Sequence, residues 1–144
     1  MSDFQIKSHN EFADVNIDLT RLEEGLKQAQ FALDVQVMAD YEPLMPRQTG
    51  GFIQLTHAKS MALAGTGVVC AGVAPMGHFL HTGKVMVDPV TRSPWARKGV
   101  TKVYTDRDLR LWYPTATAHW TEVAKQQHKE DWVRLVRQTI MEGL

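Results

Sequence analysis

The sequence predicts an α+β fold with a long N-terminal helix, an antiparallel β-meander and a C-terminal helix, all in one domain spanning residues 1–144. Three observations predict it: an apolar stripe at helical spacing near the N-terminus, a central region of short segments punctuated by Gly and Pro, and an amphipathic tail without proline. A chain of 144 residues has the length of one domain, and 44% hydrophobic with 22% charged residues is a folding composition.

The first predicted helix covers residues 20–42 and follows an N-terminal arm, 1–19, in which 14–19 is a candidate short strand. Thr20 and Glu23 have the spacing of a capping box, in which a hydroxyl and a carboxylate satisfy the first backbone N–H groups. Prolines at 43 and 46 end the helix, because proline disfavours helical geometry in the residue before it. The expected buried stripe is Leu22, Leu26, Ala29, Leu33 and Val37.

Residues 52–113 are predicted to be rich in β-structure. Two apolar runs, 60–64 and 68–74, flank Gly65-Thr66-Gly67 and have the pattern of a hairpin, whereas 52–56 fits either a helical turn or a strand. A strand at 79–87 is expected to pair with 100–105 across the proline-containing loop 88–99.

The C-terminal helical region is predicted over residues 117–141. Trp120 and Trp132 occupy helical positions and are expected in the core. Seven polar residues, 125–131, lie between two apolar patches, so the helix either exposes this turn or breaks there.

Charge is balanced overall but unevenly placed, with 16 basic and 16 acidic side chains. Residues 1–42 hold three basic and nine acidic side chains, 3 − 9 = −6, and residues 84–110 hold seven basic and three acidic ones, 7 − 3 = +4. Subunits polarised in this way can pack head to tail, whereas the alternative is that both segments are solvated surface. Without a global basic surplus, any contact with DNA has to be local.

The sequence offers no convergent set of catalytic, cofactor-binding or metal-binding residues. Cys70 is the single cysteine, which excludes an internal disulfide and a cysteine-rich zinc site. His78 and His81 have a ligand-like spacing but no acidic residue close before them. The Gly-containing segments lack the phosphate-loop pattern, and no apolar stretch reaches the length of a membrane span.

Trp95 differs from the other tryptophans, because it follows Ser93-Pro94 in a loop and precedes Arg97 and Lys98. Trp and Arg dominate interface hot spots, so we expect Trp95 to anchor a subunit interface; a tryptophan folded back over its own sheet, or one that stacks on nucleic acid, is the alternative. The predicted interface consists of Lys84, Arg92, Trp95, Arg97, Lys98 and Lys102.

The run from Thr82 to Gly99, TGKVMVDPVTRSPWARKG, resembles the central motif of a minor capsid protein family of long-tailed phages and prophages, mainly of low-GC Gram-positive hosts. The resemblance continues through residues 103–109 and resumes at His119-Trp120. The leading helix followed by Pro46-Arg47-Gln48-Thr49-Gly50 is also similar to a broader neck or tail-completion family, in which a basic-apolar pair usually stands where this chain has Gly51-Phe52.

The resemblance implies a structural virion protein, made in the host cytoplasm and located at the head-to-tail junction, without enzyme activity or cofactor. It implies a neck, connector or tail-completion ring, with copies of itself and neighbouring neck, portal-adaptor and tail-terminator proteins as partners. We also expect a passing contact with packaged DNA and no contact with a membrane. The alternative is a small nucleic-acid-binding module that uses the basic segment 84–110.

Overall fold

The computed structural model describes the backbone of residues 5–9, 14–47, 50–111 and 113–143, and the side chains from residue 19 onward. Helices and strands occur together, so the α+β class is confirmed. In chain order the elements are β1 (Gln5–His9), β2 (Asp14–Asp18), α1 (Leu19–Tyr41), the 3-10 turn η1 (Glu42–Leu44), α2 (Gly51–Leu63), α3 (Met76–Thr82), β3 (Lys84–Val87), β4 (Val103–Asp108) and α4 (Trp120–Gly143).

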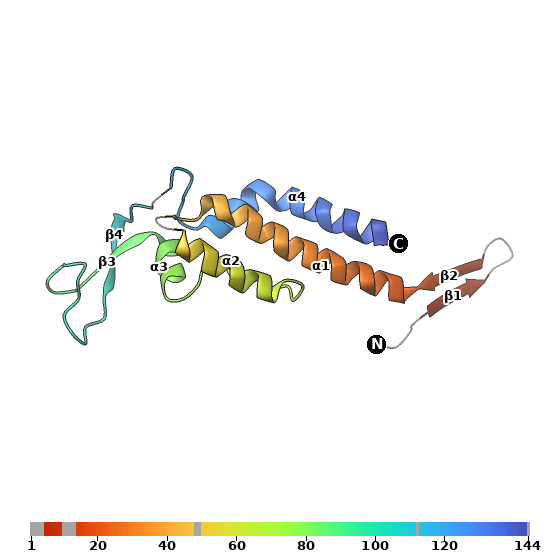
Figure 1. Cartoon of the computed structure of the whole chain (residues 1–144), viewed down its shortest axis with the longest axis horizontal. Coiled ribbons are helices and arrows are strands. Elements are labelled where there is room, and N and C mark those ends of the chain that lie inside the picture. Colours follow the sequence, from red (N-terminus) through yellow and green to blue (C-terminus); the bar gives the residue numbers. More distant parts are fainter. Residues whose placement is uncertain (1–4, 10–13, 48–49, 112, 144) are drawn as a thin grey trace.

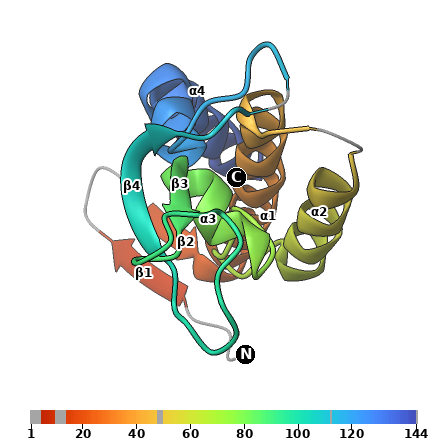
Figure 2. The ribbon, with the colours of Figure 1, turned by 90° about the vertical axis from the view of Figure 1, so that its left-hand side faces the viewer.

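The molecule is elongated, with three long helices side by side and a two-stranded ribbon at each end (Figure 1). Helix α1 lies between α4 and α2, and it runs antiparallel to α4; the end-on view in Figure 2 shows the same order. The β1–β2 ribbon extends beyond the start of α1, whereas β3 and β4 lie at the opposite end, next to α3.

Helix α1 begins at Leu19, one residue before the expected start, and its buried face differs from the predicted stripe. Ala29 and Val37 are buried as expected, but Leu26 is 49% exposed. Gly25 is buried instead, because the last turn of α4 passes directly over it: a Cβ added to Gly143 would lie 3.4 Å from the Gly25 Cα atom. The absence of a side chain at Gly25 therefore allows the two helices to approach closely.

The core forms where the end of α1, the start of α2 and the start of α4 converge. Met38, Met45, Ile53 and Trp120 make its buried cluster. The Trp120 ring is fully buried, meets Phe52 edge-on at 6.2 Å, and donates its indole N–H to the carbonyl of Ala71 at 3.0 Å. Helix α3 packs against this cluster through Leu80, and the β3–β4 ribbon begins directly after α3.

The hairpin predicted from segments 60–64 and 68–74 is wrong. Residues 60–63 are the last turn of α2, and 68–74 has no regular structure. Buried side chains of α2 satisfy this irregular backbone: the Ser60 hydroxyl donates to the Cys70 carbonyl at 2.8 Å, and the Thr56 hydroxyl accepts from the Val73 N–H at 3.2 Å. Val69 of this run packs against the core cluster, and none of the residues 68–74 pairs with a strand.

Residues 52–113 are consequently not the expected β-rich region, and among the described residues the strands form two separate ribbons instead of a meander. Residues 52–56 belong to α2, and the predicted strand at 79–87 divides into the end of α3 and the short strand β3. The pairing across loop 88–99 is confirmed, with Met86 opposite Tyr104 and Val87 opposite Val103.

Helix α4 is continuous through the polar turn 125–131, most of which is exposed. Trp120 is buried as expected. Trp132 is half-buried, and its indole N–H donates to a carboxylate oxygen of Asp40 at 2.6 Å, which ties the middle of α4 to the end of α1. Trp112, Gln48 and Thr49 lie outside the described residues.

Candidate functional site

The candidate site is the end of the molecule formed by β3, β4 and the loop that joins them. Gly83 connects this ribbon to α3 with φ of +73°, a left-handed conformation that glycine adopts without strain. A Cβ at Gly83 would lie 2.4 Å from the Ala118 Cβ, and the Gly83 carbonyl accepts from the Leu109 N–H at 2.8 Å. The ribbon is therefore attached to the helices at a closely packed junction.

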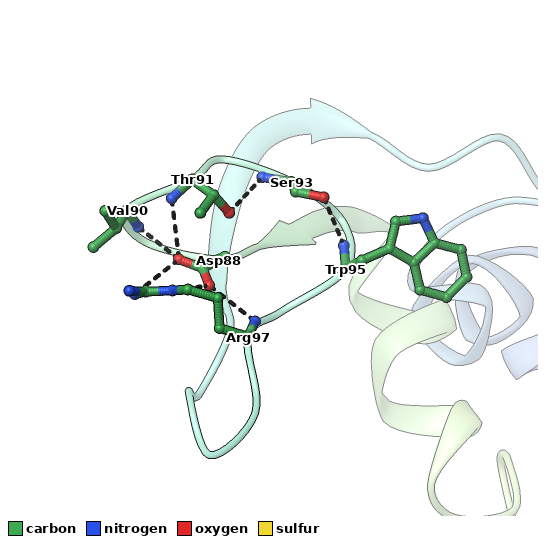
Figure 3. A network of polar contacts seen from close by, with 6 residues as sticks. All are labelled: Asp88, Val90, Thr91, Ser93, Trp95 and Arg97. Atoms are coloured by element: carbon green, nitrogen blue, oxygen red, sulfur yellow. Dashed lines mark hydrogen bonds and ion pairs between the residues drawn. The ribbon is translucent and has the colours of Figure 1, made fainter.

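The carboxylate of Asp88 organises the loop from within (Figure 3). One oxygen accepts from the backbone N–H groups of Val90 at 2.8 Å and Thr91 at 3.1 Å. The other accepts from the backbone N–H of Arg97 at 3.1 Å and from its guanidinium Nε at 2.9 Å. The side chain of Asp88 is fully covered by its own loop, and we call these contacts the Asp88 network.

The Asp88 network keeps the carboxylate ionised. The hydrogen bond from the Arg97 side chain lowers the pKa of Asp88 most, and the backbone N–H donors lower it further, against an opposing effect of burial. A depressed folded-state pKa means that the stabilisation is present above the ordinary aspartate pKa of about 3.9 and is lost in stronger acid. The loop is thus held in one shape at neutral pH.

Trp95 lies on this fixed loop with 85% of its surface exposed. Its backbone N–H donates to the Ser93 hydroxyl at 3.1 Å, and its ring points away from the Asp88 network (Figure 3). The alternative in which Trp95 folds back over its own sheet is therefore wrong.

The six residues of the predicted interface do not form one free cationic surface. Arg97 is committed to Asp88, and the Lys84 ammonium pairs with Asp108 across the ribbon. Arg92 and Lys98 are exposed, whereas Lys102 is half-buried. Asp88 was missed as a site residue, although Asp followed by Pro and Thr is typical of a turn closed by the aspartate side chain.

The His78 and His81 rings have separate partners. His78 is in hydrogen-bonding contact with the Tyr104 hydroxyl at 2.9 Å, and His81 with the Thr121 hydroxyl at 2.8 Å. Burial lowers the pKa of His81, and the neighbouring His119 lowers it further. In the part of the chain that the structure describes, no three His, Cys, Asp or Glu side chains are grouped as metal ligands.

Internal contacts also use part of the uneven charge. Asp34 accepts hydrogen bonds from the backbone N–H groups of Gly65 and Gly67, and Glu42 contacts His57 at 2.6 Å. The described part of the acidic segment runs from the β1–β2 ribbon along α1, and the β3–β4 ribbon of the basic segment 84–110 lies at the opposite end of the molecule from β1–β2 (Figure 1).

Comparison with protein-family models, curated proteins and solved structures finds no match to this chain. Among the described helices, none combines the length and the apolar character needed to cross a bilayer.

Proposed function

We propose that this chain is a structural subunit of a phage head-to-tail junction, of the neck, connector or tail-completion class, and that its β3–β4 end contacts neighbouring proteins. The observation that carries the proposal is Trp95, 85% exposed on a loop that the Asp88 network holds in one conformation. The same loop lies within the 82–99 run that resembles phage minor capsid proteins.

An exposed tryptophan on a fixed loop contributes little to folding but can contribute much to binding a partner. Large aromatic side chains that fill a partner's pocket contribute much of the free energy of association. A loop that is already ordered loses little conformational entropy on binding, so more of that contact energy remains as affinity. The loop therefore has the properties of a preformed docking element.

The proposed partners follow from this role. They are further copies of the chain in a ring and the neighbouring neck, portal-adaptor and tail-terminator proteins, with the assembled virion as its location. Packaged DNA passing through such a ring is a further, transient contact.

The test is a phage or prophage lacking this gene, examined by electron microscopy and plaque assay. We expect filled or leaking heads separate from finished tails, and joined infectious particles again when the gene is supplied in trans. Joined infectious particles in the absence of the protein would overturn the proposal.

A nucleic-acid-binding module remains the second candidate, because Trp95 is exposed in the same loop as Arg92 and Lys98 and bases stack on tryptophan. The commitment of Arg97 to Asp88 removes one cation from that surface. A gel-shift titration distinguishes the two functions. A nucleic-acid-binding module should retard DNA with an affinity that falls steeply as salt rises, whereas the ring function does not require DNA binding by the isolated protein.

A further inference from the structure

Three histidine side chains meet at the joint between the β3–β4 end and the long helices. His78 and His81 belong to α3, which lies between the ribbon and the helices, and His119 directly precedes α4 (Figure 1). The centroids of the His81 and His119 rings lie 5.2 Å apart, and the His81 ring also packs edge-on against Trp120 at 4.8 Å. The His78 ring contacts the Tyr104 hydroxyl of β4 at 2.9 Å. These contacts, which we call the histidine joint, connect α3 both to α4 and to the ribbon.

The backbone at the histidine joint is strained. The His119 N–H donates to the His81 carbonyl at 2.8 Å, with His119 at a φ of +53°, a left-handed conformation that residues other than glycine adopt at a cost. A residue persists in such a conformation only where surrounding contacts hold it there. On the ribbon side, the Leu109 N–H donates to the Gly83 carbonyl at 2.8 Å. The joint is therefore sensitive to any change in the packing around His81.

The surroundings of His81 favour its neutral form. Burial lowers the pKa of His81 most and the neighbouring His119 lowers it further, whereas Glu122 raises it and His78 lowers it. The His81 Nε2 atom is 2.8 Å from the Thr121 hydroxyl in the first turn of α4, where the positive end of the helix dipole disfavours a further positive charge. Among the described residues, these histidines and Glu122 are the ionisable groups that act on the ring.

We infer that the histidine joint is an acid-sensitive hinge, closed at neutral pH and loosened when His81 and His119 are both protonated. Two imidazolium rings 5.2 Å apart would place like charges where α3 packs against α4. Because the fold favours neutral His81, this packing is at full strength above the ordinary histidine pKa of about 6.5 and weakens as the pH falls below it.

The loop that carries Trp95 should keep its shape while the joint loosens. The Arg97 guanidinium holds the pKa of Asp88 below its usual range, so the Asp88 network should persist down to about pH 4. Mild acid would then free the orientation of the β3–β4 end relative to the long helices without changing the loop itself. This regulation goes beyond the proposed function and does not depend on it.

Two measurements on the isolated full-length protein test the hinge. In an NMR titration of the histidine rings, His81 should titrate below about 6.5. Amide hydrogen exchange at about pH 7.5 and about pH 5, corrected for intrinsic rates, should be at least tenfold faster at His119 and Leu109 at the lower pH. The loop amides that bind Asp88 and the middle of α1 should be equally protected at both pH values.

A substitution at His81 tests whether this side chain causes the response. His81→Gln keeps a polar side chain that does not titrate, and it should abolish the loss of protection at low pH. The matched control is His128→Gln, because His128 is a half-buried histidine of α4 that stacks on Trp132 instead of on the joint. This variant should lose protection at the joint as the unchanged protein does. Circular dichroism checks that both variants fold, and if His81→Gln does not, the two measurements on the unchanged protein decide.

Several results would overturn the hinge. One is a His81 ring that titrates at about 6.5 or above, as it would if the Trp120 ring stabilised its imidazolium form. Equal protection of the joint at both pH values, or a response that His81→Gln retains, would overturn it as well. None of these results bears on the neck role, which gene deletion tests, and joined particles without the gene would leave the hinge standing.

Discussion

Replacing Trp95 by alanine should leave the folded monomer almost unchanged. A fully buried tryptophan side chain removes ~150–250 Å² of surface from water. Because 85% of Trp95 is exposed, the substitution removes only about 30 Å² of buried surface. At ~25 cal/mol per Å² this burial contributes less than ~1 kcal/mol to the free energy of unfolding. For a domain of this size we expect the Tm to fall by no more than about 3 °C.

Trp120→Ala is the matched control, because it removes the same side chain from a fully buried position. The substitution leaves a cavity in the core and leaves the Ala71 carbonyl without its indole donor. Loss of a buried aromatic side chain costs ~3–5 kcal/mol, so the Tm should fall by about 10 °C or more.

Assembly should respond in the opposite order. Trp95→Ala should weaken association by ~2 kcal/mol or more, which is about 30-fold in the dissociation constant. Differential scanning calorimetry measures the Tm, and sedimentation velocity measures association with the same samples. If Trp95→Ala lowers the Tm as much as Trp120→Ala does and loses assembly only as it unfolds, Trp95 is part of the core and the reasoning fails.

Three further predictions concern the same end of the molecule. Asp88→Asn should loosen the loop at pH 7, which hydrogen exchange would show as faster exchange of the loop amides. The loop of the unchanged protein should stay ordered from pH 7 to about 4 and loosen only in stronger acid. Equal exchange rates in the two proteins at pH 7 would contradict this. Gly77→Ala should destabilise the fold by ~1–3 kcal/mol in urea unfolding, because its Cβ would lie 2.5 Å from the Gly72 carbonyl; an unchanged midpoint would show that the backbone yields there. Reversing Lys98 and Lys102 to glutamate should slow assembly at low salt and have little effect at 1 M, where the Debye length falls to ~3 Å; light scattering across a salt series measures this, and equal rates at low salt would show that these charges are only solvated surface.

Helices α1 and α4 could be predicted from the sequence because their apolar spacing and, for α1, the prolines that follow it are local signals, whereas α2 lies where β-structure was predicted. The face that α1 buries could be predicted only in part: Ala29 and Val37 are buried as expected, whereas Leu26 is exposed and Gly25 is buried. Gly25 reads as a weak point of an isolated helix, but it lies under the end of α4 and makes that approach possible. A glycine that is needed only because another helix packs against it leaves no periodic pattern in the sequence.

The segment 68–74 shows the same limit for strands. Its apolar composition favours β-pairing, whereas Ser60, Thr56 and Trp120, from two helices, bind three of its backbone groups. Such long-range bonds from side chains to backbone depend on the tertiary arrangement. At the site, the sequence around Trp95 predicted that this residue is exposed on a loop. The role of Asp88 could not be predicted, because its hydrogen-bond partners Val90, Thr91 and Arg97 come together only in the folded loop.

The most direct test of the central claim is joining in vitro with purified heads and tails that lack this protein. Adding the unchanged protein should restore infectious particles, and so should Leu55→Ala, which removes an exposed apolar side chain, 64% exposed, from α2. Folded Trp95→Ala should restore at least tenfold fewer at the same concentration. Equal restoration by Trp95→Ala, or none by the unchanged protein, would contradict the account.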